Sequence, residues 1–129
     1  MLDEKDLDKL SYGRIIYAEV YDSSGNGPAG PHYGVILNKD EEIKKFKKNP
    51  TYTIVVISHN EIIAPHFLMD VPARTGLSGK IVGSWTTPVE EAGILRVGIN
   101  LSAPEMLRVQ KLIRAADDAK QNAGRSTQS

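Results

Sequence analysis

The chain has 129 residues and contains no cysteine. Without thiols it forms no disulfide, no Cys-ligated zinc site, no iron–sulfur cluster and no thiol nucleophile. It also has no excess of charge of either sign, since 16 Lys and Arg residues balance 16 Asp and Glu residues. A neutral chain lacks the general positive field of many nucleic-acid-binding proteins, so any site for a polyanion must be a local patch.

Long hydrophobic runs are also missing. No run approaches the roughly 20 residues that a membrane helix needs, and the first ten residues, MLDEKDLDKL, lack the apolar core of a signal peptide. We therefore expect a soluble, cytoplasmic protein with no membrane contact. The length suits one domain. We expect a frayed segment over residues 1–11, a single domain over 12–119 and a disordered polar tail over 120–129.

Short runs of β-branched and aromatic residues, separated by Gly and Pro, predict a mainly β fold. In Arg14–Tyr21, alternation places Ile16, Ala18 and Val20 on one face of a strand. Residues 52–58 are apolar on both faces, which indicates a central strand. Further strands are expected at residues 33–37, 67–71, 80–85 and 94–97. This pattern favours a small barrel or sandwich.

Two connections and a helix complete the expected fold. Residues 22–31, DSSGNGPAGP, predict a long loop because Gly and Pro interrupt a strand. Residues 39–49 are densely charged and predict a short helical connection. Ser102 and Glu105 have the spacing of a capping box, in which each side chain bonds the other residue's backbone amide. An apolar stripe follows at helical spacing, so we expect a C-terminal helix that packs on the sheet.

The predicted pairing of two strands gathers polar residues at one end of the sheet. Residues 33–37 and 52–58 are expected to pair antiparallel, since a parallel pair needs a longer crossover. His32 then lies close to Ser58 and His59. Two imidazoles, which titrate near neutral pH, can serve as base and acid in phosphoryl transfer from a ribose 2′-hydroxyl without a metal. The alternative is that each histidine is an ordinary hydrogen-bonded surface group.

Other patterns are weaker. His59 and His66 have no acidic partner at zinc-ligand spacing, so neither a metal site nor a cofactor is expected. The glycine-rich stretch lacks the Lys-Ser/Thr of a phosphate loop and is interpreted as a turn. The basic run over residues 44–48 follows acidic residues and is interpreted as a solvated connection. Trp85, the only tryptophan, is interpreted as an anchor of the core or of a dimer interface.

Several short stretches carry a family resemblance. They are GRIIY at 13–17, HYGVIL at 32–37, VVIS at 55–58, TGL at 75–77, KIV at 80–82, and GINLS at 98–102 ahead of Glu105. In this order, over about residues 12 to 114, the chain resembles the PemK/MazF-like toxins of bacterial toxin–antitoxin pairs. The resemblance implies an SH3-like barrel, a homodimer, metal-independent cleavage of single-stranded RNA, and an antitoxin protein that suppresses it.

The resemblance also implies site residues. Ser58 stands where the family has a hydroxyl residue, and His32 stands where it has an arginine. With the pairing above, the candidate catalytic residues are His32, Ser58 and His59. The candidate RNA-binding residues are Arg14, Arg74 and Lys80.

The histidine at position 32 leaves two functions open. Arginine is always protonated and forks onto a phosphate, whereas neutral histidine does neither. A protonated His32 can still donate to a phosphate or to a leaving oxygen. Tyr33 also replaces the family's proline. The chain is therefore expected to be either an RNA-cleaving toxin or a non-catalytic module of the same fold that binds a protein partner or RNA. The alternative to both is a structural or accessory domain of a larger assembly with no site.

Overall fold

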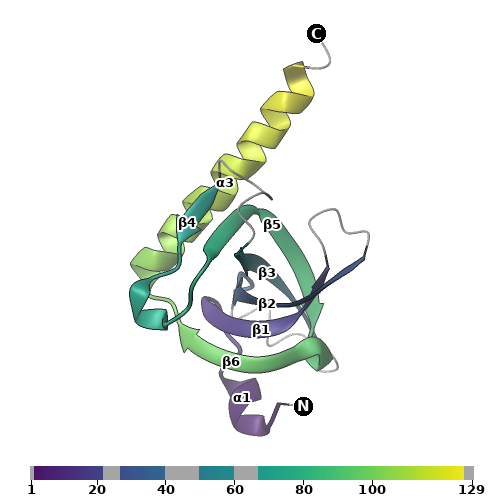
Figure 1. The fold of residues 1–129 in the computed structure, drawn as a ribbon, viewed down its shortest axis with the longest axis vertical. Coiled ribbons are helices and arrows are strands. Elements are labelled where there is room, and N and C mark those ends of the chain that lie inside the picture. The colour runs from purple at the N-terminus through teal and green to yellow at the C-terminus, as the bar shows by residue number, and fades with distance from the viewer. Residues whose placement is uncertain (1, 22–26, 40–49, 60–66, 127–129) are drawn as a thin grey trace.

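The computed structural model describes residues 2–21, 27–39, 50–59 and 67–126 (Figure 1). Its elements are α1 (Glu4–Asp8), β1 (Arg14–Tyr21), β2 (Pro28–Ile36), β3 (Thr51–Ser58), β4 (Leu68–Asp70), η1 (Ala73–Thr75), β5 (Lys80–Glu90), η2 (Glu91–Gly93), β6 (Ile94–Asn100) and α3 (Ala103–Ser126). The mainly β fold with a C-terminal helix is confirmed. The predicted helical connection falls mostly on residues 40–49, outside the described residues. Among the described helices, none combines the length and hydrophobicity needed to cross a membrane.

The strands form one curved antiparallel sheet in the order β4-β5-β3-β2-β1-β6. β3 lies between β5 and β2, as its apolar character on both faces predicts. Figure 1 shows the sheet curling round until β5, β1 and β6 enclose a central space. The curvature gives the sheet an inner face and an outer face, each with its own hydrophobic core.

The inner core fills the curl of the sheet. Ile16, Ala18 and Val20 of β1 are buried there, which confirms the face assigned to them by alternation. Trp85 is 3% exposed in the same core and its indole Nε1 donates to the Tyr21 carbonyl, 3.0 Å away. Its interpretation as a core anchor is therefore confirmed.

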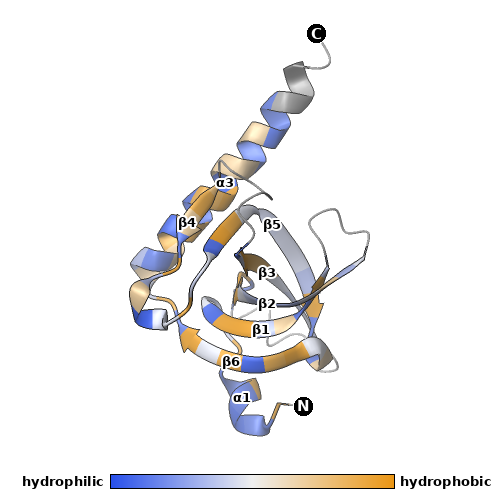
Figure 2. Ribbon diagram, in the orientation of Figure 1, coloured by the Kyte–Doolittle hydropathy of each residue, from blue (hydrophilic) through white to orange (hydrophobic). Residues whose placement is uncertain are grey.

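The outer core lies between the sheet and α3. Met106 and Val109 of α3 are buried against strand residues that include Val35 and Ile81. Gly83 of β5 lets the helix come close, because a Cβ there would lie 2.7 Å from Leu112 Cγ. The predicted packing of the helix on the sheet is confirmed, and Figure 2 shows hydrophobic and hydrophilic residues alternating along it.

Two strands extend beyond the bounds predicted for them. β2 begins at Pro28, inside the stretch predicted as a loop. Two prolines fit there because β3 pairs with β2 only from Tyr33 onward, which leaves one side of the earlier part without a described ladder partner. β5 runs on to Glu90, past the strand end predicted at residue 85. There alternate residues such as Thr87 and Val89 are buried.

Within the described residues, helices are present in both end segments, α1 near the N-terminus and the last turns of α3 near the C-terminus. Asp3 caps α1 by accepting from the Asp6 amide at 2.8 Å, and Leu10 is buried in the inner core. The segment predicted as frayed therefore packs on the sheet. α3 continues to Ser126, past the predicted boundary after residue 119, because Ala, Lys and Gln in its last turns favour helix. Its turns beyond Ala116 have exposed side chains as far as Asn122.

Candidate active site at one end of the sheet

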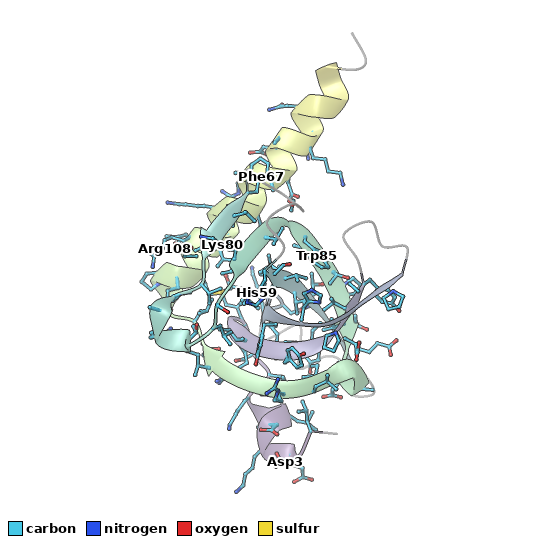
Figure 3. All side chains as sticks on the ribbon, viewed as in Figure 1. Asp3, His59, Phe67, Lys80, Trp85 and Arg108 are labelled. Atoms are coloured by element: carbon cyan, nitrogen blue, oxygen red, sulfur yellow. The ribbon has the colours of Figure 1, made fainter. Side chains whose placement is uncertain are left out.

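The pairing of β2 with β3 is antiparallel, as predicted. Its last recorded pair is Tyr33 with Ile57, so His32 and Ser58 are the next residues at that end of the ladder. His59 follows Ser58, and Lys80 of β5 pairs with Ser58 on the other side of β3. We call His32, Ser58, His59 and Lys80 the histidine rim. Figure 3 labels the His59 and Lys80 side chains.

The imidazole of His32 is held on two sides. Its Nδ1 lies 3.1 Å from the Gly30 carbonyl oxygen. A carbonyl only accepts hydrogen bonds, so Nδ1 carries a proton and the neutral ring keeps its lone pair on Nε2. The ring also meets Trp85 edge-on, with centroids 5.2 Å apart and planes at 63°. Because Trp85 is itself fixed in the core, the partly buried His32 ring has a defined orientation and a defined basic nitrogen.

The imidazole of His59 is exposed and contacts the other side of the rim. Its Nε2 lies 2.7 Å from Ser78 Oγ, in the turn before β5. Gly79 in that turn has φ +99°, and a Cβ there would lie 3.0 Å from the Ser58 carbonyl oxygen. Glycine is therefore required for the turn to approach the rim. Sequence reasoning missed Ser78. Its only signal was its place in the glycine-rich turn TGLSG.

Ser58 differs from the histidines in its burial. Only 4% of the residue is exposed, and it shares strand parity with Ile54 and Val56 of the inner core. A hydroxyl that is buried to this extent is not accessible to a ligand from solution in this conformation. Its position suits orienting its neighbours in the rim better than holding a phosphate.

The three predicted RNA-binding cations are engaged within the chain. Lys80, in the rim, forms an ion pair with Asp70, its cross-strand partner on β4. Arg14 donates to the Lys9 carbonyl at 2.8 Å and to the Gly98 carbonyl at 3.1 Å. Arg74 pairs with Glu105 at the start of α3. Only Lys80 therefore lies at the rim, and its charge is offset by a neighbouring carboxylate.

The start of α3 is a closed polar network. Glu105 accepts from the Ser102 amide at 2.7 Å and its own amide donates to Ser102 Oγ at 3.3 Å, which confirms the predicted capping box. Arg74 donates to the same carboxylate and, at 3.1 Å, to the Asn100 carbonyl. The hydrogen bond from Arg74, followed by that from the Ser102 amide, lowers the pKa of Glu105 to about 2. This network joins η1 to α3.

One surface hollow has a volume of about 440 Å³ and another has a volume of about 660 Å³. The larger lies between β4, the turn before β5 and α3, and its polar lining includes Asp70, Ser78, Glu105 and Arg108. It shares Ser78 with the hydrogen bond that holds His59. Within the described residues, no group of three or more His, Asp or Glu side chains is arranged to hold a metal ion.

Comparison by sequence yields no relative: no family model and no curated protein matches the chain. Comparison by structure does. The fold is similar to that of an endoribonuclease solved in complex with its cognate antitoxin from a mycobacterial species, with a TM-score of 0.63 and 8% sequence identity. The match covers 82% of this chain and 92% of that one. At this identity the likeness shows a shared fold across most of both chains.

Proposed function

We propose that this chain is the toxin of a toxin–antitoxin pair and cleaves single-stranded RNA at the histidine rim. The observation that carries the proposal is the oriented His32 ring, with its basic Nε2, at the same end of the sheet as a second imidazole. The shared fold with an endoribonuclease gives independent support. It is also in keeping with the family resemblance of the sequence motifs.

The reaction that suits these residues is transfer of a phosphoryl group to the neighbouring ribose oxygen. His32 Nε2 takes the proton from a 2′-hydroxyl, and the 2′-oxygen forms a bond to the adjacent phosphorus. The bond from phosphorus to the 5′-oxygen breaks, and that oxygen takes a proton from protonated His59. The products are a 2′,3′-cyclic phosphate and a free 5′-hydroxyl. Both proton transfers are made by imidazoles, so this route uses no metal.

Lys80 and Ser58 have supporting roles in this proposal. Lys80 offsets phosphate charge at the rim once its ammonium turns from Asp70 to the substrate. Ser58, being buried, positions the rim backbone between β2 and β5. Arg14 and Arg74 are assigned to structure because their guanidinium groups bind carbonyls and a carboxylate of the chain itself.

The proposal includes two partners. An antitoxin protein would suppress cleavage by covering the rim, and a second copy of the chain would complete a homodimer. Trp85, which the sequence offered as an anchor of the core or of a dimer interface, is buried in the core of its own chain, so the proposed interface uses other surfaces. Size-exclusion chromatography with light scattering measures the dimer directly. A mass of one chain, 14.2 kDa, would remove the homodimer from the proposal.

The test of cleavage uses a long single-stranded RNA in EDTA. The wild-type chain should give discrete fragments ending in 2′,3′-cyclic phosphates, and His32→Ala should leave the RNA uncut. Leu107→Ala is a control, because Leu107 is 58% exposed on α3 and belongs to no part of the rim. It should cut like the wild type. Uncut RNA with wild-type chain of normal circular dichroism would contradict the proposal.

A second candidate function is a non-catalytic binding module. It is favoured by the charge at the rim, where Lys80 is paired with Asp70 and histidine stands in place of the family's arginine. Induction in a bacterial host separates the two. Growth arrest that His32→Ala abolishes supports the nuclease. Arrest that survives His32→Ala, together with one stoichiometric partner protein on pull-down and no RNA cleavage, supports the module.

A further inference from the structure

The outer face of the sheet is covered unevenly. α3 packs on β5 and β4, while β2, β1 and β6 form the other half of the sheet. On that half three side chains stand in one cross-strand row. Tyr17 of β1 pairs with Tyr33 of β2 on one side and with Arg96 of β6 on the other. We call Tyr33, Tyr17 and Arg96 the aromatic row.

The aromatic row is a stacked arrangement. The two tyrosine rings lie 4.7 Å apart between centroids and are tilted by 48°. The Arg96 guanidinium carbon lies 4.6 Å from the Tyr17 centroid and 5.8 Å from that of Tyr33. Arg96 is exposed and both rings are partly exposed. Within the described part of the chain no carboxylate forms an ion pair with Arg96, unlike Lys80 and Arg74.

We propose that the aromatic row binds a base of single-stranded RNA by stacking. Aromatic rings and guanidinium planes are the surfaces on which proteins stack unpaired bases, and Arg96 adds a positive charge for the attached phosphate. The row contains a cation that pairs with no carboxylate of the described residues, whereas the rim cation Lys80 is paired with Asp70. The aromatic row therefore supplies binding energy that the rim lacks.

The position of the row suits a substrate that is cut at the rim, and in this respect the inference rests on the proposed function. Tyr33 directly follows His32, and successive residues of a strand face opposite sides of the sheet. RNA that crosses the end of the sheet can thus place its scissile phosphate at His32 and a neighbouring base on the row. Glu19, exposed two residues along β1 from Tyr17, repels phosphate on that side. The RNA backbone is therefore expected to continue past Arg96, on the other side of the row.

The test measures binding apart from cleavage. The probe is a fluorescent 2′-O-methyl RNA oligonucleotide, which has no free 2′-hydroxyl to attack phosphorus, and the readout is anisotropy with the full chain. Tyr17→Leu keeps apolar bulk but removes the ring, and should weaken binding about tenfold. Tyr17→Phe keeps the ring and should bind within about twofold of wild type. Tyr21→Leu, the same change at an exposed tyrosine outside the row, should also bind like wild type.

A second probe separates stacking from a structural effect. An oligonucleotide of the same length without bases keeps the phosphates but offers nothing to stack. Tyr17→Leu should bind this abasic probe as the wild type does, whereas Arg96→Gln should bind both probes more weakly. Equal affinity of wild type and Tyr17→Leu for the probe that carries bases would overturn the inference. So would an equal loss on both probes, because it would show a merely structural role.

The outcomes also separate this inference from the proposed function. RNA binding that depends on Tyr17, with no cleavage of natural RNA, supports the aromatic row and contradicts the nuclease. Cleavage that depends on His32, with binding indifferent to Tyr17→Leu, supports the nuclease and overturns the aromatic row.

Discussion

The histidine rim and the start of α3 are both polar, but they satisfy their polar groups differently. At the start of α3, the Glu105 carboxylate binds Arg74 and the Ser102 amide, and Arg74 also reaches a backbone carbonyl. At the rim, each imidazole makes one hydrogen bond to a neutral partner, Gly30 for His32 and Ser78 for His59. Each ring thus keeps a second nitrogen that bonds to no described residue.

The difference indicates different uses. A network of charge-assisted bonds contributes stability and would lose it if a ligand displaced one member. A ring held by one neutral hydrogen bond is oriented, yet can still exchange a proton through its other nitrogen. We therefore propose that the start of α3 contributes stability and that the rim carries the chemistry.

The largest expected effect is on cleavage by His32→Ala. Loss of a general base reduces turnover by about 10² to 10⁴-fold. The substitution should change the free energy of unfolding by only about 1 kcal/mol, since the ring makes one hydrogen bond and one aromatic contact. Initial rates on a labelled RNA and urea unfolding measure the two quantities. A large loss of stability with little loss of turnover would reverse the assignment.

His59→Ala should reduce the rate of RNA cleavage about 10²-fold, which is the lower end of the range for general acids and bases. The loss should disappear on a ribonucleotide 3′-(4-nitrophenyl phosphate), whose leaving group departs without protonation. His32→Ala should remain impaired on that substrate because its 2′-hydroxyl still needs a base. The rate of nitrophenolate release distinguishes the roles of the two histidines. If both variants recover equally, the acid and base assignment is wrong.

At the start of α3, Glu105→Gln should destabilise the fold by about 2 kcal/mol, through loss of the charged bonds to Arg74 and Ser102. Ser102→Ala, which removes only the capping hydroxyl, should cost about 1 kcal/mol. Chemical denaturation gives both values. Turnover below the melting temperature should match the wild type, because neither side chain belongs to the rim.

The lowered pKa of Glu105 predicts a smaller, pH-dependent effect. A carboxylate with a pKa of about 2 in the fold and an ordinary value near 4.5 when unfolded contributes stability that is complete above the higher value. That contribution is lost as the pH falls from about 4.5 to about 2, because the unfolded chain binds the proton first. Thermal unfolding followed across this range should show a steeper fall for the wild type than for Glu105→Gln. Parallel curves would contradict the proposed linkage.

The local parts of this fold could be predicted from sequence. The β1 boundaries, the inward face of Ile16 and Val20, and the Ser102–Glu105 capping box all follow from periodicity or from residues three apart. The start of β2 could not, because its prolines are tolerated only where a neighbouring ladder has ended. Sequence-local reasoning also could not foresee α1, whose packing depends on Leu10 reaching the inner core.

In the site, too, some features could be predicted from the sequence and others could not. Antiparallel pairing alone placed His32 at the same end of the sheet as Ser58. The partners that decide what these residues do are far apart in the chain. Arg74 and Glu105 are 31 residues apart, His59 and Ser78 are 19 apart, and the aromatic row joins three strands. Only the folded sheet shows that Arg74 pairs with a carboxylate, whereas Arg96 pairs with none in the part of the chain that the structure describes.

One experiment tests the contrast between the two regions most directly. His32→Gln and Glu105→Gln each replace a titratable side chain by glutamine, one in the rim and one at the start of α3. Their cleavage rates on the same RNA in EDTA, at a temperature where both are folded, should differ by about 10² or more, with Glu105→Gln equal to the wild type. Equal rates for the two variants would contradict the account.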